Sequence, residues 1–290
     1  MLTAPHTNSR AQLALSLNDA PAAQPLVVSY GVGVDSTALL VALYRRGIRP
    51  DLILFADVGE AEKPETYAYL PIINAWLQSI GFPSITIVRY EPTRAPYSTL
   101  EGKCLQNQTL PSLAFGKHSC SLVFKAAPQD KHIAQWRPAV DAWSFGLRVK
   151  KAIGYDNGDQ DCRRRTKADK AVAKKAAQGD RDAARYEYWY PLQEWGIDRI
   201  GCLNLIASAG LPLPMKSACW FCPASKKSEI IWLRDTHPIL FNRALTMERR
   251  ARDGMHGLKT VKGLGRNFAW ADLATADAST VVDDLETLRP

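Results

Sequence analysis

The chain has 290 residues, 46% of them hydrophobic, which is enough to bury the core of one large domain or two small ones. Lys and Arg outnumber Asp and Glu by 37 to 29, and the net charge of +8 favours polyanionic partners such as nucleotides or nucleic acid. No apolar run is long enough to span a bilayer, and the first residues lack a secretory pattern. These features exclude a membrane-spanning protein and predict a cytoplasmic one.

Strands alternate with helices along the first two thirds of the chain. Residues 1–24 lack sustained periodicity and are expected to form a mobile leader. The strands are expected at 25–30, 51–55, 84–90, around 151–155 and at 187–192, and the helices between them at 36–46, 64–80 and 121–136. This alternation predicts an α/β fold, with an open parallel five-stranded sheet flanked by helices.

The remainder of the chain has a helical pattern. Helices are expected at about 196–209, 226–236 and 238–252. We therefore predict a nucleotide-binding domain at 25–195, a C-terminal helical, cysteine-bearing region at 196–270, and a loose tail at 271–290.

A glycine-containing loop follows the first expected strand. The segment from Ser29 to Thr37 reads Ser-Tyr-Gly-Val-Gly-Val-Asp-Ser-Thr. Its glycines would let backbone amides approach phosphate oxygens at a helix start, and Ser36 and Thr37 add hydroxyl donors. It is neither a Walker loop nor a dinucleotide fingerprint. The alternative is a glycine turn that caps an ordinary helix.

The loop resembles the PP-loop of ATP pyrophosphatases, whose pattern is Ser-Gly-Gly-x-Asp-Ser. Asp35 and Ser36 match that pattern, whereas Gly31 replaces its first Ser and Val32 its first Gly. Ser29, just upstream, could supply the missing hydroxyl.

Further segments resemble the phosphoadenosine phosphosulfate reductase family, in the family's order, over roughly residues 25–250. The resemblance implies a HUP (adenine nucleotide alpha hydrolase-like) fold. It is closer to the ATP-cleaving sulfur-transfer relatives than to true reductases, which degrade the loop and carry a C-terminal cysteine that is absent here. The matching segments are Leu54–Gly59 with Pro64–Tyr69, His118–Lys125 with Pro128, Ile153–Asp156, Arg163–Arg165, and Tyr190–Leu192 with Trp195.

This resemblance implies the cofactors ATP and Mg²⁺ and a set of site residues. A cation at Lys125 or Arg164 would neutralise charge on departing pyrophosphate. The expected catalytic residues are Asp35, Ser36, Lys125 and Arg164. The expected nucleotide-binding residues are Ser29, Gly31, Gly33, Asp35, Ser36, Thr37, Asp57, Gly154 and Tyr155.

Four of the six cysteines form a candidate metal site. Cys219 and Cys222 have the spacing by which two thiolates reach one metal, and Cys104 and Cys120 could fold back upon them. Such a set suits a 4Fe-4S cluster or structural Zn²⁺, and His118 offers a competing zinc ligand. Packed thiols without metal are the remaining alternative. The family resemblance favours the cluster, with Cys104 as the fourth ligand.

The segment 148–185 is basic, with twelve Lys or Arg against six Asp. Lys170 and Lys174 are one helical turn apart, in a stretch rich in Ala that buries little. The segment is therefore either a solvated face or a nucleic-acid contact.

The main functional hypothesis is an enzyme that binds ATP, adenylates an acceptor and supports sulfur transfer to it. A nucleic-acid acceptor would account for the charge, and a sulfur-donor protein would be a second partner. One alternative is a sulfonucleotide (PAPS or APS) reductase. The other is a non-catalytic nucleotide-binding partner in a DNA-modification or phage-defence system. The sequence does not indicate an oligomeric state.

Overall fold

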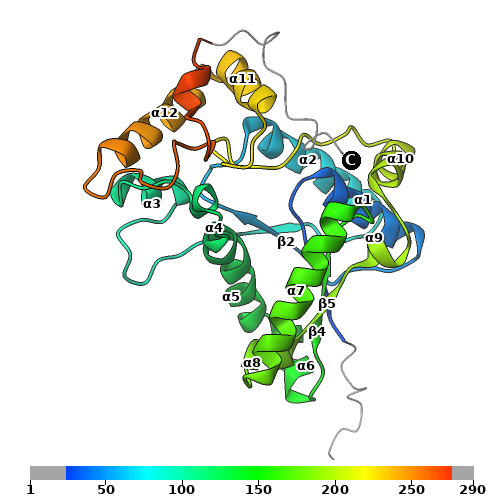
Figure 1. Ribbon diagram of the computed structural model, residues 1–290. Coiled ribbons are helices and arrows are strands. Elements are labelled where there is room, and N and C mark those ends of the chain that lie inside the picture. The colour runs from blue at the N-terminus through cyan, green and yellow to red at the C-terminus, as the bar shows by residue number, and fades with distance from the viewer. Residues whose placement is uncertain (1–23, 276–290) are drawn as a thin grey trace, which may run out of the picture.

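The computed structural model describes residues 24–275. Five strands form one fully parallel sheet in the order β3-β2-β1-β4-β5 (Figure 1). The predicted five-stranded parallel α/β fold is therefore confirmed. The strands are β1 Leu26–Ser29, β2 Leu52–Asp57, β3 Ile85–Arg89, β4 Val149–Ile153 and β5 Tyr186–Trp189.

Helices connect and cover the strands. The helices up to β4 are α1 Val34–Arg45, α2 Pro64–Ser79, α3 Leu100–Gln106, the 3-10 helix Ser112–Phe115, α4 Ser119–Ser121, the π-helix Leu122–Ala126, α5 Ala127–Gln135 and α6 Arg137–Ser144. Those after β4 are α7 Asp159–Ala177, α8 Arg181–Arg185, α9 Pro191–Glu194, α10 Arg199–Ser208, α11 Lys227–Thr236, α12 Pro238–Asp253 and the 3-10 helix Trp270–Leu273. None of the described helices is both long and apolar enough to cross a membrane.

The sheet is covered on both faces, as the alternation within β2 shows. Ile53 and Phe55 pack with α1, α2 and α10 on one face, whereas Leu52 and Leu54 pack with α5 and α6 on the other. Successive side chains of a strand point to opposite faces, so a strand covered on both sides is apolar throughout. All six residues of β2 are buried, which is why its sequence shows no polar alternation.

A second core lies beside the sheet, between α3, α11 and α12 (Figure 1). Its largest fully buried side chains are Trp220, Trp270, Phe124 and Phe221. The predicted helices at 226–236 and 238–252 are confirmed as α11 and α12. Leu273 is buried in this core, so the first residues of the predicted tail are held; the rest of the tail and the leader up to residue 23 lie outside the described residues.

Two predicted elements differ in extent. The helix expected at 121–136 is a π-helix followed by α5, and it ends at Gln135. The strand expected at 187–192 ends at Trp189, because Pro191 cannot donate a ladder hydrogen bond and instead begins α9.

The strand order fixes where a ligand can bind. From β1 the chain moves outward through β2 to β3, and it then returns to place β4 on the other side of β1. Ligands of open α/β sheets bind at such a switch point, outside the carboxyl ends of the strands. The loops that follow β1 and β4 are therefore the first place to examine.

Candidate functional site

The loop between β1 and α1 directs two backbone amides at one oxygen. The N–H groups of Gly31 and Gly33 both donate to Ser36 Oγ at 3.2 Å, and this hydroxyl donates to the carbonyl oxygen of Gly33 at 3.1 Å. Gly33 caps the helix without a side chain, so the first amides of α1 keep their positive potential. Backbone amides that converge at a helix start are a donor set able to bind an anion, and here Ser36 Oγ accepts from both.

Val32, inside this loop, has φ of 59° and no exposed surface. A β-branched residue rarely adopts this left-handed conformation, which costs on the order of 1–3 kcal/mol. Burial of the isopropyl group in the core offsets this strain. The departure of Val32 from the PP-loop pattern thus stands at the one position of the loop with a positive φ.

Three carboxylates meet beside the loop. Oxygens of Asp35, Asp156 and Asp161 all lie within 4.8 Å of one another. Burial raises the pKa of Asp35, as do the other two carboxylates, against the opposing effect of Arg199 at 2.6 Å. Carboxylate oxygens gathered in this way could hold a divalent cation such as Mg²⁺, which takes oxygen ligands at about 2.1 Å.

The loop after β4 completes this side of the site. A Cβ on Gly154 would lie 2.8 Å from the Cα and the N of Ser36, so β4 approaches the start of α1 backbone to backbone. Tyr155 stacks on Tyr190 with ring centroids 5.5 Å apart, and the Arg164 guanidinium lies 4.9 Å from the Tyr155 centroid. Arg164 also pairs with Asp161 at 2.9 Å. Gly154, Tyr155 and Arg164 therefore lie with Asp35 and Ser36.

Three other predicted nucleotide ligands face protein partners. Ser29 donates to Gln129 at 2.8 Å, and Thr37, with no exposed surface, pairs with Tyr30 at 3.0 Å. The buried Asp57 accepts from two amides of its own turn, from a tyrosine hydroxyl and from Arg89. In this conformation the hydroxyl of Thr37 and the carboxylate of Asp57 do not reach the loop surface, because internal donors and acceptors occupy them.

Lys125 lies at the cysteines. Its ammonium group is 2.8 Å from Glu62, whose side chain has no exposed surface. Burial opposes the charge of Lys125, but Glu62 and the thiolate forms of Cys219 and Cys222 outweigh this and raise its pKa. Glu62 also accepts from Ser217 at 3.3 Å. The ion pair therefore belongs to the cysteine site.

The cysteines gather in the second core. Cys104 comes from α3, Cys120 from α4, and Cys219 and Cys222 from the turn before α11. A thiolate at Cys120 raises the pKa of each of the other three, so Cys120 lies within electrostatic range of all of them. The structure thus brings together the four cysteines that the sequence analysis selected.

The cysteines can be compared with the geometry that a zinc site requires. Four thiolates around one zinc ion at 2.3 Å are about 3.8 Å apart. Among the described residues, no three cysteine or histidine ligand atoms lie within 4.8 Å of one another, and His118 is exposed. The described residues therefore present no ready-made zinc site, and four cysteines are also the ligand set that an iron-sulfur cluster uses. Burial raises the pKa of Cys104 to about 12, so metal loading must release protons.

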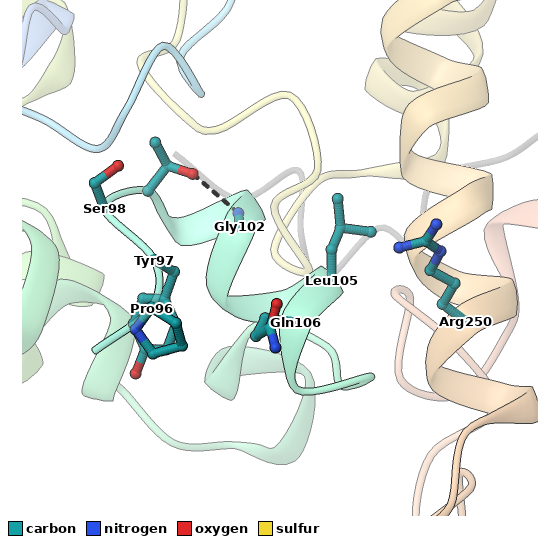
Figure 2. A pocket seen from close by; sticks show the side chains of 8 residues that line it. Pro96, Tyr97, Ser98, Gly102, Leu105, Gln106 and Arg250 are labelled. Atoms are coloured by element: carbon teal, nitrogen blue, oxygen red, sulfur yellow. Dashed lines mark hydrogen bonds between the residues drawn. The ribbon is translucent and has the colours of Figure 1, made fainter. Parts of the chain in front are cut away.

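A cavity of about 380 Å³ lies elsewhere, along α3 (Figure 2). Tyr97 and Arg250 stand on its walls, and Thr99 accepts the amide of Gly102 at 2.9 Å within it. Its lining includes neither the β1–α1 loop nor a cysteine. We therefore do not assign it to the candidate site.

Sequence reasoning missed four side chains at these two centres. Arg199 and Asp161 lie at the acidic cluster, and Glu62 and Ser217 lie beside the cysteines. A signal existed for Asp161, which follows the quoted motif ending at Asp156 by five residues. No local pattern marks the others, because distant segments bring them into place.

Comparison with known proteins adds a likeness in structure. No protein-family profile matches the chain, and no curated protein matches it. Among solved structures it is similar to the U34-tRNA thiolase NcsA from Methanococcus maripaludis, described with its 4Fe-4S cluster, at 15% identity and a TM-score of 0.36. The likeness covers 84% of this chain and 76% of that chain.

Proposed function

We propose that the chain is an ATP pyrophosphatase-type enzyme that binds Mg-ATP at the β1–α1 loop, adenylates an acceptor and supports sulfur transfer to it. One observation carries the proposal. The amides of Gly31 and Gly33 converge on a single oxygen at the start of α1, at the switch point of the sheet. A phosphate oxygen in place of Ser36 Oγ would meet the same donors.

The loop and its neighbours have distinct tasks in this proposal. An acceptor oxygen bonds to the α-phosphorus while the bond to pyrophosphate breaks, and the loop amides and Arg164 stabilise the charge on the leaving group. Asp35, Asp156 and Asp161 would hold Mg²⁺, which neutralises phosphate charge when bound. A sulfur nucleophile then displaces AMP from the adenylated acceptor.

The cysteine site would hold the iron-sulfur cluster. When bound, the cluster would supply a site that holds the sulfur to be transferred. Cys104, Cys120, Cys219 and Cys222 would ligate it, and the positive charge of Lys125 would lower the cost of thiolates at Cys219 and Cys222. The aromatic side chains of the second core pack in the same cluster as the buried Cys104 and Cys219.

Pyrophosphate release from Mg-ATP tests the proposal, with and without nucleic acid. Asp35→Ala should abolish release, whereas Asp159→Ala, an exposed aspartate at the start of α7, should keep it. Unchanged release by Asp35→Ala would remove the loop from the mechanism. ATP binding without release would favour a non-catalytic partner, and thioredoxin-dependent sulfite formation from PAPS would favour a reductase.

The absorption spectrum of anaerobically purified protein tests the cluster. A broad visible band that Cys222→Ser removes and Cys162→Ser retains supports it, because Cys162 lies on α7 and outside the second core. A colourless protein that carries zinc overturns it.

A further inference from the structure

The helix α7 carries four cations in one stripe. At 100° per residue, positions 163, 167, 170 and 174 fall within about 60° of one another around the helix axis, over about 17 Å. Arg163, Lys167, Lys170 and Lys174 are all exposed, and none has a carboxylate partner among residues 24–275. We call these four residues the α7 stripe.

The acidic residues of α7 leave this stripe uncompensated. Asp161 turns toward the candidate site and pairs with Arg164, and Asp169 pairs with Arg165 at 3.5 Å on another face. Asp159 lies on the same side as the stripe, but it is the first residue of the helix. There its negative charge interacts favourably with the positive end of the helix dipole. From Arg163 to Ala177 the stripe face is therefore purely basic.

Packing does not account for the length of α7. Of its 19 residues only Asp161 is buried, so the helix contributes almost nothing to either core. Most helical stability in proteins comes from burial of an apolar face, which α7 lacks. Because these exposed cations have no carboxylate partner, a polyanion can bind them without first breaking an ion pair.

The stripe begins within one turn of the candidate site but faces away from it, because its four positions lie about 120–180° around the helix axis from Asp161. α7 begins where Asp161 and Arg164 meet Asp35 and Tyr155, and it runs from there toward α8 (Figure 1). A chain of phosphates along the stripe would therefore lie on the solvent side of α7, with one end near the start of the helix. Successive stripe cations are about 4.5 to 6 Å apart along the helix axis. This spacing suits a polymer that carries anions at regular intervals.

We infer that the α7 stripe binds the phosphodiester backbone of a nucleic acid. The inference rests on the proposed function in that it names nucleic acid as the acceptor class. Its contacts are to phosphates, so recognition along the stripe does not depend on base sequence. Binding in the absence of ATP tests it independently of pyrophosphate release.

The test uses the full chain and two fluorescent probes, a 20-nucleotide single-stranded RNA of mixed sequence and a 20-base-pair DNA duplex. Affinity is measured against salt from 0.05 to 0.3 M. The stripe variant replaces all four cations by Ala. The control variant removes four other exposed cations that also lack carboxylate partners among the described residues, namely Arg249, Arg250, Lys259 and Lys262, on and after α12.

Loss of four phosphate contacts should reduce the slope of log affinity against log salt by about 3 for RNA, and weaken binding a few hundred-fold at 0.1 M salt. The control variant should keep most of the slope. Equal losses in both variants, or wild-type binding by the stripe variant, would overturn the inference. The double substitution Lys167→Glu with Lys170→Glu is a second variant, and we expect it to weaken binding because the new carboxylates repel phosphates. Both positions are exposed, so α7 should still fold.

Discussion

Gly154→Ala should push the start of α1, with Asp35 and Ser36, away from the loop after β4. The added Cβ would lie 2.8 Å from the Cα and N of Ser36 and 3.0 Å from the carbonyl carbon of Asp35. Carbon atoms prefer 3.5–4.0 Å, so the overlap is about 0.7 Å or more. All three neighbours are backbone atoms, and no side-chain rotation can relieve the contact. The first turn of α1 must therefore move away from β4.

The cost of this movement can be bounded. Overpacking in a close contact costs about 1–3 kcal/mol. A value near 2 kcal/mol corresponds to about 4–8 °C in Tm for a chain of this size class. The same displacement pulls Asp35 away from Asp156 and Asp161, so Mg²⁺ should no longer enhance nucleotide binding.

Gly31→Ala is the matched control in the same site. Its Cβ would meet only Ser36 Oγ at 3.8 Å, an ordinary contact, and its φ is not positive. We expect a Tm within about 2 °C of wild type for this variant, since an unstrained Gly→Ala change is neutral or slightly stabilising. Thermal unfolding of both variants, with and without Mg-ATP, provides the measurement. Equal stability of Gly154→Ala and Gly31→Ala would refute the close approach of β4 to α1.

Three further outcomes follow from buried groups. Lys125→Met should cost about 1–3 kcal/mol in urea unfolding because it leaves the carboxylate of Glu62 buried and unpaired, whereas Lys131→Met, from an exposed ion pair, should cost less than about 1 kcal/mol. Burial raises the pKa of Cys202, so the folded state holds its proton more tightly. Stability is then fully present below pH 9.0 and falls as pH rises above it; Cys202→Ala should flatten this fall by at most about 1.4 kcal/mol per pH unit in unfolding titrations. Glu248→Ala should free the last described segment, whose three backbone amides it accepts, and limited proteolysis should then cut near residue 260 faster than in wild type.

The sheet was predictable because a local sequence pattern marks each of its strands. Every predicted strand overlaps an observed one, since apolar runs of four to seven residues bounded by turn residues have few other structures available. The three C-terminal helices were equally clear. The helices α3, α6 and α7 were not predicted, because few of their residues are buried and this leaves little apolar periodicity to detect.

The site was predictable only where residues adjacent in sequence act together. The β1–α1 loop presents Gly31, Gly33 and Ser36 within one turn, so its pattern is visible in the chain. Asp57 and Thr37 were also chosen from local patterns, but strand and helix direction turn both into the interior. A pattern shows which residues are near a strand end; it does not show which way each side chain faces.

Glu62 illustrates what local patterns leave out. It stands in the turn after β2, and a bridge to Cys219 carries the cysteine segment alongside it. The same turn's Ala61 accepts the amide of Trp220 at 2.8 Å. Its ion-pair partner Lys125 is 63 residues away and its hydrogen-bond partner Ser217 is 155 residues away, so no local pattern in the sequence marks Glu62 as a buried, partnered acid.

The same contacts give a physical reason for two centres in one chain. Ser217 donates to Glu62, and a Cβ on Gly33 would touch the Cβ of Ser217 at 3.7 Å. The segment that carries Cys219 therefore packs directly against the nucleotide loop. An acceptor activated at the loop would be within a few side chains of sulfur held at the cysteines. Under the proposed function, the acceptor would therefore pass between two centres that both adjoin the segment around Ser217.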